Sequence, residues 1–303
     1  MEVLQALLPV ILSILAGYGF RRYGGVPLRS WQHLSLVAYY LFTPALEIRV
    51  LANKPLDGLP WQGLIGSVLS VLLLLTLLLI AWQRWGRPQQ AATFTSLYQG
   101  GIRFNTFIAL VMAGQLFGDE GMAAVALVAA VMILLVNLLC VLIFVYYLGS
   151  EPVRPTLLLR ELLSNPLIAG CLVGLALNLS GIGLGGAALS FFDLMGQAAL
   201  PIGLMVVGAS LQLERLKGNW EVIYTASLVQ LLLKPVLALA AVAWFGLGGA
   251  LAAALVLCFA VPAPPSAYVL ALKKGGDSQT MAAMITVQTF FAAFSMPLVI
   301  GLI

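Results

Sequence analysis

The sequence predicts an all-α membrane protein with ten transmembrane helices, arranged as two inverted five-helix repeats. Three observations lead to this fold class. Hydrophobic residues make up 62% and charged residues 9% of the 303 residues, whereas about a quarter of the residues in a soluble domain are charged. Apolar runs reach about twenty residues, the length of a membrane-crossing helix, and they lack the alternation of β-barrel strands. Finally, a set of landmark residues recurs at one spacing along the chain.

Apolar runs separated by short connections predict each span in turn. The expected spans cover residues 3–20, 31–51, 62–83, 91–116, 121–148, 157–180, 187–211, 220–245, 248–273 and 279–302. No connection is long enough for a soluble domain, and residues 149–156 form the expected central linker. The first span lacks the basic start and small-residue cleavage site of a signal peptide, so we expect it in the mature protein.

Basic residues lie almost entirely on one side of this topology. The opposite side holds Lys54, with Arg49 at a span end. Loops after odd-numbered spans hold Arg21, Arg22, Arg29, Arg84, Arg87, Arg154, Arg160, Arg215, Lys217, Lys273 and Lys274. Because cytoplasmic loops are enriched in Lys and Arg, we expect these loops in the cytoplasm and both termini outside.

Internal repetition is the third observation. The landmark pairs are Pro9 with Pro166 and Pro44 with Pro201, each 157 residues apart, Trp61 with Trp220 at 159, and Asp119 with Asp277 at 158. Residues 1–150 and 151–303 would each hold five spans, so the second unit must enter the membrane from the opposite side. This inverted repeat is the architecture of many secondary transporters.

The ninth span carries the clearest interruption. Residues 258–277 read CFAVPAPPSAYVLALKKGGD and contain Pro262, Pro264 and Pro265. Each proline removes a backbone donor and clashes with the preceding turn, so one continuous helix cannot pass through all three. A broken backbone persists in lipid only where protein or a watery cavity surrounds it. Such a break indicates a transporter's binding site; the alternative is a proline kink in an ordinary helix.

The repeat predicts a matching interruption in span four. There Gly100 and Gly101 precede Arg103, Asn105 and Thr106. A shift of 158 residues aligns these last three with Val261, Ala263 and Pro264, at the same depth. Two broken helices that cross there would direct half-helix ends at a shared cavity, and the N-terminal ends favour an anion.

Four stretches carry a family resemblance. FNTFIALVMAGQLFGDEG, LLSNPLIAGCLVGLALNLSG, ALPIGLMVVGASL and VPAPPSAYVLALKKGGD resemble the auxin efflux carrier family in its compact bacterial form, and the motif order matches over essentially the whole chain. The chain departs from the family pattern at Phe107, where glycine is common, which leaves the sharpness of the break in span four open.

This resemblance implies an architecture like that of sodium/bile-acid symporters and sodium/proton antiporters, with helices four and nine broken and crossing. It implies a scaffold of helices 1, 2, 6 and 7 that forms a homodimer. Helices 3–5 and 8–10 would form a transport domain that moves past the scaffold like an elevator. The family's substrates are organic anions, either auxin or malonate-like carboxylates. The location implied is the bacterial inner membrane.

Candidates for substrate contact surround the two expected breaks. Arg103 suits a two-point hydrogen-bonded pair with a substrate carboxylate. The alternative is that it pairs with a nearby acidic side chain or extends into a water-filled pocket. Asn105 is favoured because its amide can serve both a freed backbone group and a carboxylate. The remaining candidates are Thr106, Ala263, Pro264, Pro265, Tyr268, Gln230 and Lys234.

Lys234 lies in the middle of a span, directly before Pro235. Besides substrate contact, two roles stay open for it: it takes the place of a cation, or it donates to carbonyls freed at the break. Since both intramembrane charges near the crossing are basic, an anionic ligand is favoured. Glu47 and Asp193 are candidates for a coupling proton, with a structural cap or ion pair as the preferred interpretation because both spans belong to the expected scaffold.

Other function classes lack their characteristic residues. Cys140, Cys171 and Cys258 lie in apolar runs without CxxC spacing, and His33 stands alone, so we expect no metal and no cofactor. The sequence contains no Walker loop and no nucleophile elbow, the motifs that would indicate an enzyme. Its composition is not that of a nucleic-acid binder. The expected partners are the small organic anion and the lipid bilayer. An anion-selective channel and a non-transporting anion sensor remain as alternatives.

Overall fold

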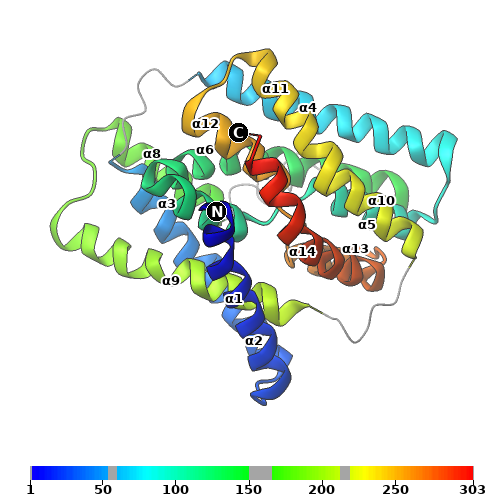
Figure 1. Ribbon diagram of the computed structural model, residues 1–303, viewed down its shortest axis with the longest axis horizontal. Coiled ribbons are helices and arrows are strands. Elements are labelled where there is room, and N and C mark those ends of the chain that lie inside the picture. Colours follow the sequence, from blue (N-terminus) through cyan, green and yellow to red (C-terminus); the bar gives the residue numbers. More distant parts are fainter. Residues whose placement is uncertain (1, 54–59, 150–165, 212–218, 303) are drawn as a thin grey trace.

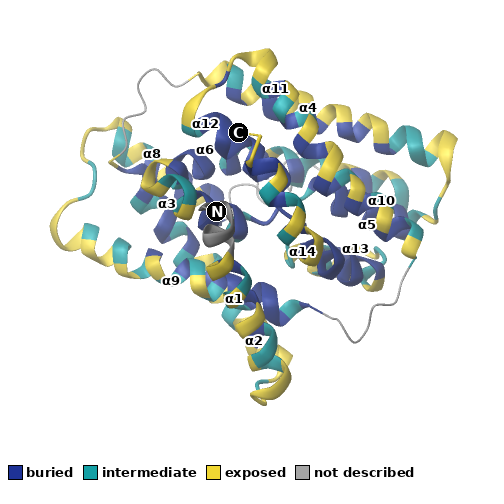
Figure 2. Cartoon of the chain, viewed as in Figure 1, coloured by how far each residue is buried: buried dark blue, intermediate teal, exposed yellow. Residues whose placement is uncertain are grey.

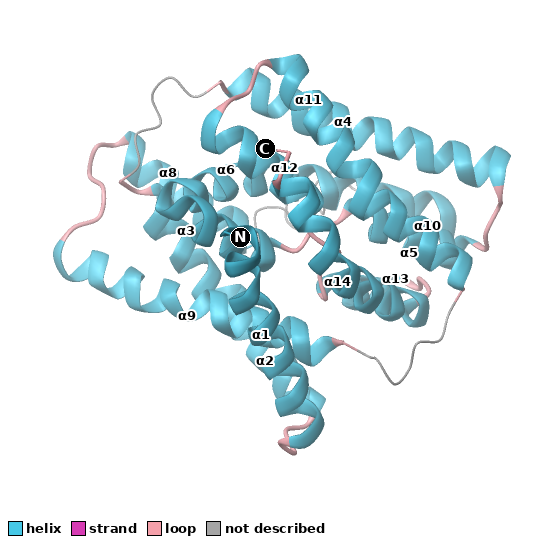
Figure 3. Ribbon diagram, in the orientation of Figure 1, coloured by secondary structure: helices cyan, strands magenta, loops and turns pink. Residues whose placement is uncertain are grey.

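The protein consists of helices joined by short connections in the part that its structure, a computed structural model, describes. This part covers residues 2–53, 60–149, 166–211 and 219–302, with side chains from residue 8 onward, and it contains no strand (Figure 3). A helix satisfies its own backbone hydrogen bonds, as lipid requires. Of the linker expected at residues 149–156, only Gly149 is among the described residues. Five of the basic residues named above also lie outside the described part: Lys54, Arg154, Arg160, Arg215 and Lys217.

Six helical runs in the described chain are long and apolar enough to cross a membrane. They are Leu28–Leu51, Trp61–Gly86, Ala91–Leu148, Gly186–Ser210, Trp220–Phe245 and Ser278–Ile300. The fold class is therefore confirmed as an all-α, multi-pass membrane protein, while the count of ten spans stays a prediction. The run Ala91–Leu148 has 58 residues, far more than the roughly 20 that one crossing needs.

One group of helices packs closely around glycines. It consists of α1 (Glu2–Tyr23), α2 (Leu28–Val37), the π-helical turn η1 (Ala38–Phe42), α3 (Thr43–Leu51), α8 (Pro166–Leu179) and α9 (Gly186–Ser210) (Figure 1). A Cβ atom on Gly208 would lie 1.8 Å from the Ile14 carbonyl oxygen of α1, and one on Gly170 would lie 2.8 Å from Cα of Pro44 in α3. The backbones therefore touch, which only glycine allows here.

A second group contains the remaining helices. It consists of α4 (Trp61–Ala81), η2 (Trp82–Gly86), α5 (Ala91–Ile102), α6 (Thr106–Leu148), α10 (Trp220–Leu228), η4 (Val229–Leu233), α11 (Lys234–Phe245), α12 (Gly249–Ala260), α13 (Ser266–Lys274) and α14 (Ser278–Ile300). In Figure 1 the first group occupies the lower left, while α4, α5, α10 and α11 lie to the right. The long α6 packs on α12 and also contacts α1, α3, α8 and α9, so it joins the two groups.

Two interruptions divide α5 from α6 and α12 from α13. The non-helical residues are 103–105 and 261–265. Both α5 and α12 have 12 residues, and they end in matching C-caps, Arg103 at φ −66, ψ 162 and Val261 at φ −71, ψ 152. Both half-helices are almost entirely buried (Figure 2). Despite Phe107, span four is thus fully broken, at the residue that the shift of 158 matches with Val261.

A third interruption lies inside α6 at Gly118, where φ is +60 and ψ is −152. A residue with a side chain would be strained at this φ. This interruption falls between the expected spans four and five, which were predicted to be separated by residues 117–120. The matched α5 and α12 support the predicted repeat at that pair of elements; the inverted repeat of the whole chain remains a prediction.

Candidate functional site

A cavity of about 740 Å³ lies where the two helix groups meet. Its walls come from α2, η1, α3, α8 and α9 of the first group and from α6, α13, α14 and both interruptions of the second. Arg103, Lys273 and Lys274 are the basic residues among the described residues that line it, and none of these lining residues is Asp or Glu. The described part of the lining therefore carries positive charge without a balancing carboxylate.

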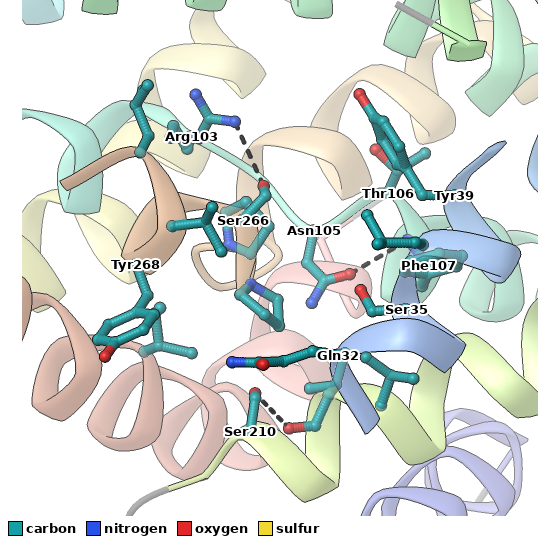
Figure 4. A pocket seen from close by; sticks show the side chains of 18 of the residues that line it. Gln32, Ser35, Tyr39, Arg103, Asn105, Thr106, Phe107, Ser210, Ser266 and Tyr268 are labelled. Carbon is teal, nitrogen blue, oxygen red and sulfur yellow. Dashed lines mark hydrogen bonds between the residues drawn. The ribbon is translucent and has the colours of Figure 1, made fainter. Parts of the chain in front are cut away.

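Arg103 ends α5 and extends its guanidinium along the cavity wall. Nη1 donates to Asn137 Oδ1 at 3.2 Å and Nη2 donates to Ser266 Oγ at 3.3 Å (Figure 4). Both acceptors are neutral, and no salt bridge to Arg103 occurs within the described chain. Its Nε is buried and has no hydrogen-bond partner there. The guanidinium is thus held in place, while its charge is left unpaired.

Asn105 performs two tasks at the start of α6. Its Oδ1 accepts hydrogen bonds from the backbone N–H groups of Phe107, at 3.1 Å, and Ile108, at 3.4 Å, which caps the helix. Its Nδ2 is buried without a partner in the described structure. Figure 4 shows this nitrogen directed toward the centre of the cavity, away from Phe107.

The second interruption closes the opposite wall. Pro264, Pro265, Ser266 and Tyr268 line the cavity from the start of α13, and Thr106 lines it from the start of α6. Two helix N-termini, which carry partial positive charge, therefore border the same space. Asn105 Oδ1 accepts from two N–H groups of α6, and the N–H groups of Ala267 and Tyr268 donate to Pro264 O and Pro265 O, so the positive character comes from the helix dipoles.

Unpartnered polar atoms of the cavity wall are all of one kind. Among the lining residues, the buried side-chain atoms without a hydrogen-bond partner are Arg103 Nε, Asn105 Nδ2 and Trp31 Nε1. Each is a donor. A buried donor without a hydrogen-bond partner costs about 1–3 kcal/mol of stability. The arrangement therefore suits a ligand that brings acceptors, such as a carboxylate.

Three of the predicted contact residues lie behind the wall. Lys234, Gln230 and Ala263 are fully buried and do not line the cavity. Lys234 Nζ and Gln230 Nε2 donate to backbone carbonyls at the breaks, and the N–H of Ala263 donates to Gln288 Oε1 at 3.0 Å. Lys234 therefore donates to freed carbonyls, and the same geometry is compatible with the other role considered for it, the replacement of a cation.

The helix-break residues serve packing and backbone hydrogen bonding. Gln288 Nε2 donates to Gly100 O at 2.9 Å, so this one side chain on α14 bridges both interruptions. A Cβ on Gly101 would lie 3.1 Å from Val229 Cγ1, so the glycines let α5 approach its neighbours. Pro262 is buried in the second interruption.

The two acidic candidates lie away from the cavity. Arg49 Nε donates to Asp193 Oδ1 at 2.6 Å, and Arg49 Nη1 donates to Asp119 Oδ1 at 3.0 Å, so Asp193 belongs to an ion pair. Glu47 is completely buried beside Gly170 and Cys171 of α8, and neither oxygen has a hydrogen-bond partner of ordinary geometry in the described structure. Neither residue lines the cavity.

Sequence reasoning missed the contribution of α2 and η1. Gln32, Ser35 and Tyr39 line the cavity from one helical face (Figure 4). Their spacing of three and four residues predicts one helical face, but it does not distinguish a cavity wall from an ordinary interhelical contact. Ser266 could have been found from its position directly after Pro265. Asn137 of α6 both lines the cavity and orients Arg103.

Comparison with known proteins gives one clear match. A family model described as "Membrane transport protein" matches residues 2–300, essentially the whole chain. No curated protein matches the sequence.

Proposed function

Because the chain belongs to the auxin efflux carrier family of membrane transport proteins, we propose that it is a secondary transporter for a small organic anion. The observation that carries the proposal is a set of donors that have no partner among the described residues, in a cavity whose described lining contains no Asp or Glu: Arg103 Nε, Asn105 Nδ2 and Trp31 Nε1. A carboxylate would accept from these groups and neutralise the guanidinium. Arg103 would bind the anion, and Asn105 would orient it.

The proposed substrate contacts are those in the cavity wall. Thr106, Pro264, Pro265 and Tyr268 join Arg103 and Asn105 there. Lys234, Gln230 and Ala263 would act from behind, by keeping the two interruptions in place. Malonate-like dicarboxylates and auxin-like aromatic acids are the probes that the family suggests.

Transport would proceed by an elevator movement of the second helix group past the first. The cavity between the two groups supports this, since sliding one group would carry a bound anion with it. The cavity lies next to loops that the enrichment of Lys and Arg assigns to the cytoplasm. The lining residues beside these loops are Leu28, Ser210 and Lys273. We therefore take the described state as open to the cytoplasm, with both termini outside, in a bacterial inner membrane and in a homodimer formed through the first group.

Counterflow in proteoliposomes tests this function. With unlabelled carboxylate inside and labelled carboxylate outside, a carrier produces a transient overshoot of label. A channel would instead give ionic current without an overshoot, and a sensor would bind the anion without flux. We expect an overshoot with malonate or indole-3-acetate; its absence with both, and with a wider carboxylate series, would contradict transport.

The variant Asn105→Asp tests the site itself. It keeps an oxygen to cap Phe107 and Ile108 but replaces the inward donor by a negative acceptor. A hydrogen bond to a charged group contributes about 1.5–3 kcal/mol, so we expect the half-saturating carboxylate concentration to rise by about tenfold to a hundredfold. Asn219→Asp is the matched control, because Asn219 caps α10 through Val222 N–H and does not line the cavity. Equal effects of the two substitutions would remove Asn105 from the site.

A further inference from the structure

The end of α5 exposes backbone oxygens that no helix can satisfy. Ile102 is the last residue of α5 and Arg103 is its C-cap, the first residue of the interruption, so neither carbonyl has an N–H partner four residues ahead. Helix C-terminal ends also carry partial negative charge. Inside a bilayer, where water is absent from the hydrocarbon, such oxygens need a donor or a cation.

The ammonium of Lys234 lies at this position. Nζ contacts Ile102 O at 2.8 Å, Arg103 O at 3.1 Å and Gln230 Oε1 at 3.1 Å. It also lies 5.6 Å from the centroid of the Phe259 ring, within range of a cation–π interaction. Its three protons therefore meet three oxygens. Neutral oxygens arranged around one positive centre are also the ligands that an alkali-metal ion prefers.

The charge of Lys234 has no acidic counterpart among the described residues. Lys234 is fully buried, and none of the salt bridges in the described chain involves it. A buried cation without a carboxylate is costly unless dipoles and carbonyls replace its solvation. If hydrogen bonding alone were needed here, a neutral amide would supply it at less cost, as Gln288 does for Gly100 O. The positive charge itself therefore has a function.

We propose that Lys234 is a built-in monovalent cation, and that its ammonium occupies a site that would otherwise take Na⁺ or NH₄⁺ to hold the α5 interruption in shape. This inference does not depend on which anion is transported. It implies that the wild-type protein needs no metal cation to order the interruption. It also implies that removing the side chain creates a site for a small cation.

Thermal unfolding of the purified protein, without any carboxylate ligand, tests the proposal. The variants are Lys234→Ala, which opens the site, Lys234→Met, which fills most of the space with an apolar chain, and Lys234→Gln, which keeps donors without charge. Each is measured in chloride salts of choline, Na⁺, NH₄⁺ and methylammonium at one ionic strength. Choline is the reference because it is too large for the site.

We expect the wild type to show the same midpoint in all four salts. Lys234→Ala should unfold roughly 5 °C lower or more in choline, and one or more small cations should raise its midpoint saturably. Lys234→Met should be destabilised without this recovery, and Lys234→Gln should stay below the wild type in choline. A Gln variant as stable as the wild type, or an Ala variant that responds to cations no more than the Met variant, would overturn the proposal.

A second comparison covers the case in which Lys234→Ala does not fold. Lys234→Arg keeps the charge in a larger group, and Lys234→Gln removes it with little change in length. A charge-dependent site predicts more folded protein from Arg than from Gln, and the reverse order would contradict it. Because none of these measurements uses a transported anion, failure of the counterflow experiment and failure of this proposal are distinguishable.

Discussion

At the scale of single residues, Asn105 links the fold to the proposed chemistry. One end of its amide caps α6 through Phe107 and Ile108, and the other end has no partner among the described residues and faces the cavity. The cap prevents the amide from turning, so the donor is held in position before any ligand arrives. A preorganised donor binds an acceptor without paying for reorientation.

Phe107 forms a contact between the two helix groups beside this amide. A Cβ on Gly203 of α9 would lie 2.3 Å from Phe107 Cδ1, so the ring rests directly on the glycine. We predict that Gly203→Ala displaces the ring and the first turn of α6. Overpacking of this kind costs about 1–3 kcal/mol, and we expect a lower midpoint of thermal unfolding together with weaker carboxylate binding.

A double variant separates the contact from a general effect on α9. Gly203→Ala combined with Phe107→Leu should recover most of the lost stability, since the smaller side chain makes room for the added methyl group. Gly19→Ala serves as control, because a Cβ there meets no atom within 4 Å. If the double variant is no more stable than Gly203→Ala alone, the Phe107 contact is not the cause.

The sequence grouped the candidate residues around the two interruptions, but it did not indicate which of them line the cavity. Arg103 and Asn105 were found because polar residues interrupt an apolar run. Gln230, Lys234 and Ala263 were assigned to the same depth, yet they lie behind the cavity wall. Sequence spacing gives the height of a residue in the membrane. The side of a broken helix on which it lies depends on how the half-helices pack, which the spacing does not contain.

At the scale of elements, the two interruptions were predictable because proline and glycine act locally. Pro262, Pro264 and Pro265 exclude a continuous helix whatever surrounds them, and the structure interrupts the chain at residues 261–265. The matching interruption at 103–105 was found through the spacing of 158 residues, and α5 and α12 have the same length.

Other elements depended on packing and could not be read from the pattern. The polar face of α2 with Gln32 and Ser35 has the appearance of ordinary interhelical hydrogen-bonding positions, so it did not suggest a cavity. The π-helical turn η4 lies directly before Lys234 and Pro235. Proline lacks the N–H of a regular ladder, but the type of local helix that results depends on neighbouring contacts.

At the scale of the whole molecule, Arg49 connects the two helix groups. Its bond to Asp193 lies within the first group, between α3 and α9, whereas its bond to Asp119 reaches α6 of the second group. If one group slides past the other, the first distance stays constant and the second changes. These two pairs share one residue, so they form a matched test of an elevator movement.

We predict that a covalent link across the groups stops transport and a link within one group does not. Arg49→Cys with Asp119→Cys, bridged by a flexible bis-maleimide, should abolish most counterflow. Arg49→Cys with Asp193→Cys, bridged in the same way, should retain the counterflow of the unbridged Arg49→Cys variant. The native cysteines are buried and should compete little for the reagent. Equal inhibition by both bridges, or by neither, would contradict a movement between these groups.

The central claim is that an anion binds between the interruptions. Its most direct test is an experimental structure of the wild-type protein with a bromine-substituted carboxylate, chosen because it shows saturable binding. Anomalous signal locates the bromine independently of how the density is interpreted. We predict the carboxylate oxygens within hydrogen-bonding distance of Arg103 Nε and Asn105 Nδ2. A carboxylate ordered elsewhere, with neither of these donors in contact, would contradict the account.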